Sequence, residues 1–513
     1  MQALLDAVKN GEIEFLQKIL MEVGKEDLNS QDYDGCTALM LATRGHKKEC
    51  VELLVNAKAD LEVEDYDGRT GLITAVCEGN TDCVRSLVAA EANLEAMDYN
   101  GYTALILAVR ESKNDCVQLL LDAKADLDVQ DADGHTCLIL AALMGNIECA
   151  KLLVNAKAHC DAKANGDKTA LVWAALKGDA ELTQLLVSTK ANCDIKDRYG
   201  KTALIWAASG GEDECTQLLV DANADCDIRD NDGNTALIMS ARSGNYRCIQ
   251  LLVDAKANVH VRDNNDSPAL IHASQSGNST CVKLLATAGA DLKTALLWAA
   301  ARGKTDCVQL LVDAKADLDA KDECGKTALL WVAEKGKSDC VQLLIDAKAD
   351  YNADDKQNRT ALILAVCAGR TECVRILVDA KPNLEAKDYN GSTALIRAAV
   401  WGKNDCAQLL IDAKADLNAQ DDHGYTALIH AAQNGNLEFV HSLAAAGVGL
   451  ETAFFWAASC GITECVQLLL KAKANILSSD AQGRNALMYA ASGGHTMCVQ
   501  MLARLGADYY SDA

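Results

Sequence analysis

The chain has few aromatic residues and no long apolar run. Only 4% of its 513 residues are Phe, Trp or Tyr, although 50% are hydrophobic, so Ala and Leu must form most of the interior. That composition favours thin, closely packed helices over one large core. The chain also lacks the roughly 18 uninterrupted apolar residues that a membrane span needs, and it has no basic segment ahead of an apolar one at its start. We therefore expect a soluble, unexported protein.

An excess of positive charge is absent as well. The 49 Lys and Arg residues are outnumbered by 73 Asp and Glu residues, which gives a net charge of −24. A surface of this sign repels a phosphate backbone, so nucleic acid is not an expected partner. Acidic residues spread over the whole length also keep a long molecule in solution.

One phrase recurs throughout the chain: Thr-Ala-Leu, an apolar residue, a variable residue, and Ala-Ala or a close variant. Thirteen of the fifteen intervals between its copies are 33 residues, or 35 at the N-terminus, and two are 26. A unit of this length cannot bury its own apolar face and must stack on its neighbours, so the period predicts a solenoid of sixteen units. The phrases begin at Gln2, Thr37, Thr70, Thr103, Thr136, Thr169, Thr202, Thr235, Pro268, Thr294, Thr327, Thr360, Thr393, Thr426, Thr452 and Asn485.

The residue pattern of each unit predicts a turn followed by two helices. Counting from the first residue of the phrase as offset 0, apolar residues at offsets 2, 3, 5 and 6 and a Gly at offset 9 indicate a short helix that ends in the left-handed conformation. Apolar residues at offsets 13, 14, 17 and 18 indicate a second amphipathic helix. Asp-x-x-Gly-x ahead of each full phrase, as at Asp65, predicts a tight turn in which the Asp side chain binds nearby backbone amides.

These features resemble the ankyrin repeat, whose hallmark is Thr-Pro-Leu-His-x-Ala in a 33-residue unit of a hairpin turn and two helices. The resemblance extends from Gln2 to about Tyr509 and implies an all-α solenoid of helix-turn-helix repeats with β-hairpin-like turns, called fingers below. Three departures are systematic: Ala replaces Pro at offset 1, an apolar residue replaces His at offset 3, and Lys usually replaces Gly at offset 21. Examples of that Lys are Lys58, Lys124, Lys157, Lys190, Lys315, Lys348 and Lys414.

The array is interrupted twice, where a 26-residue interval lacks the finger. We expect one continuous solenoid in three blocks: residues 1–291 with repeats 1 to 9, residues 292–449 with repeats 10 to 14, and residues 450–513 with repeats 15 and 16. At both interruptions, and at Gly506, offset 21 is Gly, which suits an abrupt turn of the backbone. A missing finger either leaves a notch that exposes the aromatic residues behind it or is closed by a neighbouring repeat.

A longer duplication is superimposed on the repeats. Residues 76–101 recur at 366–391 with most positions identical, an offset of eight units of 33 plus one of 26. Many identical residues therefore report common origin and packing rather than function.

The 22 cysteines do not predict a metal site or disulfides. Thirteen stand at offset 13, where the two exceptions are Leu182 and Phe439, so the position requires an apolar side chain. Helices in a stack lie about 8 to 10 Å apart, too far for neighbouring cysteines to be bridged. No Cys-x-x-Cys pair occurs. We expect small buried thiols in a reducing compartment, the cytoplasm or nucleus.

No residues form a predicted catalytic, cofactor-binding or metal-binding site, because each Cys and Asp cluster is explained by the repeat and the His residues are scattered. The variable positions of the fingers and first helices, which line the concave face of ankyrin arrays, are the candidate partner-binding surface. The finger candidates are Tyr66, Tyr99, Tyr102, Tyr199, Tyr389 and Tyr425. Offset 4 of the first helix holds the other candidates, which are either half-buried between repeats or exposed to a partner: Trp173, Trp206, Trp298, Trp331 and Trp456.

The sequence thus predicts a non-catalytic scaffold that binds proteins through the concave face, with no nucleic acid, membrane insertion or small-molecule substrate. The alternatives are an inhibitor or regulatory subunit of an enzyme, or an enzyme that acts from the concave groove.

Overall fold

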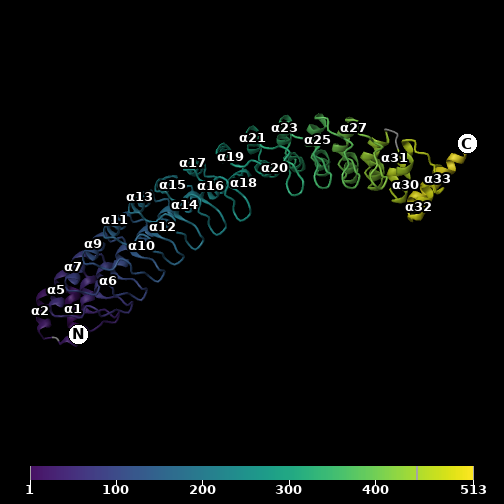
Figure 1. Ribbon diagram of the computed structural model, residues 1–513. Coiled ribbons are helices and arrows are strands. Elements are labelled where there is room, and N and C mark those ends of the chain that lie inside the picture. Colours follow the sequence, from purple (N-terminus) through teal and green to yellow (C-terminus); the bar gives the residue numbers. More distant parts are fainter. Residues whose placement is uncertain (1, 23, 446–448, 512–513) are drawn as a thin grey trace. The chain divides into compact units, whose positions relative to one another are not determined.

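The structure is a computed structural model that describes residues 2–22, 24–445 and 449–511. It divides into two compact units, Met1–Ala269 and Leu270–Ala513. Each unit is a stack of helix pairs, and the fingers project from one side of the pairs (Figure 1). The described residues contain sixteen such pairs, so the predicted all-α solenoid is confirmed. The three predicted blocks, with limits at 291 and 449, stay a prediction.

In unit 1 the repeats pair a first helix with a second helix, and α3 (Lys25–Leu28) is an additional short turn. The first helices are α1 (Gln2–Asn10), α4 (Ala38–Arg44), α6 (Gly71–Cys77), α8 (Ala104–Arg110), α10 (Cys137–Met144), α12 (Ala170–Lys177), α14 (Ala203–Gly210) and α16 (Ala236–Ser243). The second helices are α2 (Ile13–Glu22), α5 (Lys48–Asn56), α7 (Thr81–Ala89), α9 (Asn114–Asp122), α11 (Ile147–Asn155), α13 (Ala180–Ser188), α15 (Asp213–Asp221) and α17 (Tyr246–Asp254).

Unit 2 follows the same scheme, except that α18 starts one residue before it. Its first helices are α18 (Ala269–Ser276), α20 (Ala295–Arg302), α22 (Ala328–Lys335), α24 (Ala361–Cys367), α26 (Ala394–Val400), α28 (Ala427–Gln433), α30 (Leu450–Ser459) and α32 (Ala486–Ser492). Its second helices are α19 (Ser279–Thr287), α21 (Thr305–Asp313), α23 (Ser338–Asp346), α25 (Thr371–Asp379), α27 (Asn404–Asp412), α29 (Leu437–Ala444), α31 (Thr463–Lys471) and α33 (Thr496–Ser511).

The recurring phrase starts and packs the first helix. Thr103 has extended backbone, and its hydroxyl accepts a hydrogen bond from the amide of Ile106 at 3.3 Å. Such an N-cap stabilises a helix by about 0.5–2 kcal/mol. Leu105 and Ile106 then point into the core and are fully buried. Within a unit, helix pairs pack on their neighbours in sequence, as α14 does on α16 and α13 on α15.

The fingers are hairpin-like turns without regular strands in the part of the chain that the structure describes. In the finger at Asp65, the amide of Asp65 donates to the carbonyl of Arg69 at 3.0 Å, and the amide of Gly68 donates to the carbonyl of Asp65 at 2.9 Å. Isolated antiparallel bridges replace a ladder at Met97 with Thr103, Arg262 with Pro268, and Asp354 with Thr360.

All 22 cysteines are free thiols, and those at offset 13 are buried. Burial raises their pKa, that of Cys307 to about 11. Some thiols also donate to the preceding repeat, as Cys149 Sγ does to Asn114 Oδ1 at 3.0 Å. The prediction that this position holds small buried thiols is confirmed.

Among the described residues, those at offsets 9 and 21 adopt left-handed backbone, with one exception. Gly145 after a first helix has φ +72°, and Lys124 after a second helix has φ +66° although it carries a side chain. Gly289, at the first interruption, has φ +85°. The prediction of a turn at Gly506 is wrong, because this residue lies inside α33, which continues to Ser511 where the other second helices have ended. A helical Gly is tolerated at about 1 kcal/mol relative to Ala.

Both short repeats lack a finger. At the first, only Asp291 to Thr294 separate Ala290 from α20, and Trp298 on that helix is 40% exposed. At the second, part of the connection, residues 446–448 with Gly447 and Val448, lies outside the described residues. None of the described helices is both long and apolar enough to cross a membrane.

Candidate functional site

The fingers and first helices together form the finger face, and one Asp per finger organises it. Asp197 shows the pattern: its Oδ1 accepts hydrogen bonds from the amides of Tyr199 and Lys201, both at 2.9 Å. The twelve equivalent Asp residues all make the same two bonds where the contacts are described, so the Asp closes the turn, as the sequence predicted. Most of these carboxylates are buried beneath the finger.

In five repeats with described contacts, the second oxygen of this Asp accepts a hydrogen bond from the residue at offset 4 of the first helix. Trp206 Nε1 donates to Asp197 Oδ2 at 3.0 Å, and Trp331 Nε1 donates to Asp322 Oδ2 at 2.8 Å. Other repeats use a different donor in the same place: Arg397 Nε to Asp388 at 2.5 Å, His430 Nε2 with Asp421 at 2.7 Å, and the Tyr489 hydroxyl to Asp480 at 2.7 Å.

These bonds change how the offset 4 tryptophans are interpreted. Trp206 and Trp331 are half-buried, and each indole N–H is already bound to a carboxylate. Their ring faces carry Lys201 and Lys326 at 4.2 Å, which leaves them partly covered. Contact between these tryptophans and a partner stays a prediction, because a half-buried ring can hold the finger in place through its N–H and still expose one edge to a partner.

Trp173 is the exception that tests this scheme. Its finger has Ala164 where the other full fingers have Asp, and Trp173 Nε1 is buried without a hydrogen-bond partner. Lys168 lies 4.3 Å over the ring. An unsatisfied buried N–H costs on the order of 1–3 kcal/mol, so this repeat is a locally weak point of unit 1.

The two finger-less repeats differ from each other. Trp298 is exposed, whereas Trp456 is half-buried and packs edge-on against Tyr425 with ring centroids 5.2 Å apart. Phe455, on the same helix as Trp456, stacks on Tyr489 at 5.6 Å. A neighbouring finger and helix therefore close the second interruption, while the first leaves its Trp accessible.

Four of the six predicted finger tyrosines are exposed: Tyr66, Tyr99, Tyr199 and Tyr389. Tyr102 is half-buried under Arg110, whose guanidinium lies 4.7 Å over the ring, and Tyr425 is half-buried against Trp456.

Sequence reasoning missed Trp401 and the arginines beside it. Trp401, at offset 8, is 58% exposed and follows α26 directly. It lines a hollow on the finger face together with Arg359, Arg397 and Tyr389. The signal was present: it is the one Trp of six outside the offset 4 row, and its counterpart in the earlier copy of the duplication is Glu111.

The electrostatics of the fingers favour ionised Asp. Burial alone would raise the pKa of Asp355 and Asp421, but the side-chain bonds from Arg359 and His430, with the finger amides, outweigh it and lower both. The hydroxyl of Tyr489 lowers the pKa of Asp480 to about 2. These carboxylates are therefore fixed acceptors and are poorly suited to proton transfer near neutral pH.

One group of side chains has the composition of a metal site. Asp131, Asp133 and His135 bring their ligand atoms within 4.8 Å of one another at a finger. However, Asp131 Oδ1 accepts the amides of Asp133 and His135, and its Oδ2 lies 3.2 Å from His135 Nδ1. The cluster is explained by the finger turn that the other repeats share.

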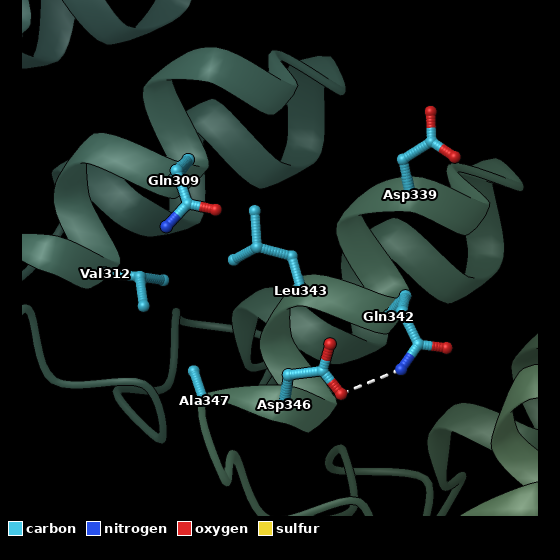
Figure 2. Close-up of a pocket in the computed structure, with 7 residues that line it drawn as sticks. All are labelled: Gln309, Val312, Asp339, Gln342, Leu343, Asp346 and Ala347. Carbon is cyan, nitrogen blue, oxygen red and sulfur yellow. Dashed lines mark hydrogen bonds between the residues drawn. The ribbon is translucent and has the colours of Figure 1, made fainter.

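The second helices present a different, more uniform surface. Figure 2 shows a hollow between α21 and α23, where Gln342 Nε2 donates to Asp346 Oδ1 at 2.8 Å. The same Gln–Asp pair recurs on other second helices, for example Gln118 with Asp122 and Gln408 with Asp412. The side chains that differ from repeat to repeat thus concentrate on the finger face.

Comparisons with known proteins agree with this architecture. The family model for ankyrin repeats in sets of three copies matches residues 4–98, 91–164, 157–230, 211–295, 296–388, 380–450 and 428–513. No curated protein matches the sequence. Among solved structures, the chain is similar to the ankyrin repeat domain of Bcl-3, described as a unique member of the IkappaB protein family, with 28% identity over 42% of this chain and 97% of that one and a TM-score of 0.41. Because the family model covers nearly the whole length, and because every full repeat has the finger and helix pair built above, the chain belongs to the ankyrin repeat family.

Proposed function

We propose that this protein is a non-catalytic scaffold that binds protein partners through its finger face. Ankyrin repeats indicate a protein–protein interaction role in general, and the choice of face is our inference. The observation that carries it is a set of exposed tyrosines on fingers that are fixed in place. Tyr99 and Tyr389 are examples, and both are among the most exposed large side chains of the protein.

Hydrogen bonds between fingers keep these tyrosines in register. The amide of Tyr99 donates to the carbonyl of Asp67 at 3.1 Å, and the amide of Tyr389 donates to the carbonyl of Gln357 at 3.0 Å, so each finger is tied to the one before it. A rigid Tyr offers contact area and a hydroxyl while it loses little conformational entropy on binding, which is why tyrosines are common interface anchors.

An enzyme that acts from this face is the weaker alternative. Hydrogen bonds from Arg359 and Tyr489 lower the pKa of Asp355 and Asp480, so these two finger carboxylates are poor general acids near neutral pH. Burial raises the pKa of the thiols at offset 13, so they are poor nucleophiles. A regulatory subunit of an enzyme would itself be a protein-binding scaffold and would use the same surface. The intracellular location stays a prediction.

Site-specific photo-crosslinking tests the choice of face. A photoreactive amino acid replaces Tyr99 or Tyr389 on the fingers, and in matched controls it replaces Gln118 or Gln408 on the second helices of the same repeats. We expect crosslinks to cellular proteins from the finger positions and few from the second helices. Crosslinks mainly from Gln118 and Gln408 would contradict the proposal.

A further inference from the structure

One place on the finger face of unit 2 differs in chemistry from the rest. A hollow of about 330 Å³ lies between the fingers that precede α24 and α26. Its lining includes two guanidinium groups, Arg359 and Arg397, two aromatic rings, Tyr389 and Trp401, and the half-buried thiol of Cys367. Aromatic and Arg side chains are the residues most enriched in the centres of protein interfaces.

The two arginines carry more N–H donors than the protein uses. Arg397 donates through Nε to Asp388 Oδ2, and Arg359 donates through Nε and Nη2 to Asp355 Oδ2 at 2.9 and 2.7 Å. Each guanidinium has five N–H donors. Four N–H groups of Arg397 and three of Arg359 thus remain for water or for a ligand that accepts hydrogen bonds.

The acids that neutralise these arginines lie underneath them. Asp355 and Asp388 are buried, and their remaining oxygens accept the amides of their own fingers, whereas both guanidinium groups are partly exposed. The outward layer of the hollow is therefore positive, in a chain whose net charge is −24. Guanidinium forks match the geometry of carboxylate and phosphate groups, and the carboxylate is the one that an unmodified peptide carries.

The rings beside the arginines are free to pack on a ligand. Tyr389 is 77% exposed and Trp401 is 58% exposed, and both line the same hollow. Rings of this size, next to the cations, match a ligand that places a large apolar side chain beside its carboxylate.

The earlier copy of the duplication has the same frame without this chemistry. Leu107 stands in place of Arg397, and Glu111 in place of Trp401. Leu107 is buried and Glu111 is exposed. The fold thus accepts either pair of residues. Arg69 and Tyr99 correspond to Arg359 and Tyr389, so the later copy differs from the earlier one in its second arginine and its tryptophan.

We propose that this hollow, which we call the Arg–Trp pocket, binds a peptide segment of a partner protein in which an Asp or Glu lies next to a large apolar side chain. The carboxylate binds the free N–H groups of Arg397 and Arg359, and the apolar side chain packs on Trp401 and Tyr389. This deepens the proposed function and rests on it, because it names one site on the finger face and the chemistry of the segment that fills it.

The test uses the full chain and a displayed library of random heptapeptides as the probe. Peptides that bind the wild-type protein are selected first. Those that also bind the Arg397→Leu/Trp401→Glu double variant, which has the residues of the earlier copy at these two positions, are then removed. We expect the remaining peptides to be enriched in Asp or Glu beside Phe, Leu, Trp or Tyr. The most enriched peptide, made synthetically with blocked termini, should lose at least tenfold in affinity when its Asp or Glu becomes Asn or Gln.

Two further variants separate binding from folding. Trp401→Glu alone changes an exposed side chain. It should lower the affinity for the synthetic peptide at least tenfold and leave the circular dichroism spectrum of the protein unchanged. Glu111→Gln, at the equivalent place in unit 1, should leave its affinity unchanged. The proposed pocket is refuted if no peptide distinguishes the wild-type protein from the double variant, or if replacing the peptide's Asp or Glu by Asn or Gln has no effect on affinity. In either case the finger face is still supported as the binding surface if its positions crosslink to cellular proteins. Crosslinks from the second helices alone would instead refute the proposed function.

Discussion

Residues 69–111 and 359–401 contain the two copies of the duplication, 76–101 and 366–391, together with the equivalent repeat positions on either side of them. They show which features the fold dictates and which it leaves free. In both, the finger Asp, Asp98 or Asp388, accepts the amides two and four residues on. The Tyr that follows is exposed in both, and the same apolar positions are buried. The features that survived duplication unchanged are those that close the turn and fill the core.

The copies differ where a side chain reaches the finger face. Leu107 in the first copy is buried against its surroundings, whereas Arg397 in the second extends to the finger Asp. Glu111 and Trp401, one turn further on, are both exposed. Offset 8 is exposed in both copies, so its side chain can change freely, whereas offset 4 is part of the core in the first copy and holds a donor to the finger Asp in the second.

A single finger residue also redirects an arginine. In the first copy Arg69 pairs with Asp67 at 3.4 Å, and its Nε is buried without a partner. In the second copy Gln357 stands in place of Asp67, and Arg359 instead turns its Nε and Nη2 to Asp355. The same Arg is therefore well satisfied in one copy and poorly in the other.

The largest expected effect tests whether the two cores are equivalent. Leu105→Ala and Leu395→Ala should each destabilise their repeat by about 2–5 kcal/mol, because both side chains are buried to the same degree and truncation leaves a cavity. Hydrogen exchange of the amides of α8 and α26 in urea measures each loss locally, since long arrays need not unfold in two states. With Gln118→Ala as the surface control, clearly unequal losses would show that the copies are packed differently.

The next effect concerns the Arg that distinguishes the copies. Arg397→Leu should destabilise its repeat by about 1–3 kcal/mol, because Asp388 Oδ2 loses a charged hydrogen-bond donor. Leu107→Met, a change of similar shape at the equivalent position, should cost less than about 1.5 kcal/mol. Thermal and urea unfolding measure both, and equal costs would mean that the Arg397–Asp388 bond contributes nothing.

The third prediction is an effect of pH. The folded pKa of Asp355 lies below its ordinary 3.8 because its bonds to Arg359 and to the finger amides outweigh burial. The stabilisation is therefore complete above the unfolded pKa of about 3.9 and is lost as the pH falls through the lower folded value. Carbon-13 NMR titration of the carboxyl should show this low pKa and its rise in Arg359→Gln. Arg69→Gln is the matched control in the first copy, and an Asp355 that titrates normally in wild type would refute the pairing.

The smallest effect is at the end of the second helix. Glu91 and Lys381 occupy equivalent left-handed positions, with φ +61° and +55°. A cation is favoured beside the carbonyl end of a helix, so Glu91→Lys should stabilise by about 0.3–1 kcal/mol and Lys381→Glu should destabilise by a similar amount. Urea unfolding at low and high salt measures this, because salt screens the interaction. A difference that does not shrink in salt would point to backbone strain instead of charge.

The fold could be predicted almost completely from the sequence because the same pattern of residues occurs in sixteen repeats. Offsets of Thr, Leu and Gly located the caps, the core and the ends of the helices. Gly506 shows the limit of this prediction. By analogy with Gly289 we expected a turn there, but α33 continues through Gly506. The same residue at the same offset adopts a turn only where the preceding helix ends.

The candidate site was less predictable because it depends on pairs of residues far apart in the pattern. Five tryptophans at offset 4 stood out as a row, but the hydrogen bond that two of them, Trp206 and Trp331, donate to the finger Asp nine residues earlier follows from the geometry of the turn. Trp401 and the two arginines gave no regular signal, since each occurs at its offset in few repeats. Comparison between the copies, rather than along the repeat, is the sequence observation that singles out Arg397 and Trp401.

The structure of the repeat that begins at α20 affects how fast the solenoid folds and unfolds there. It lacks a finger, and Thr294 makes no capping bond, with φ −100° and ψ −16°, whereas Thr327 at the start of α22 caps the amide of Leu330. Folding along a stack of repeats proceeds by each repeat adding to its neighbour. A folding front that reaches α20 within unit 2 therefore gains less there than at the next repeat, and we expect the amide protons of α20 to exchange with solvent faster than those of α22.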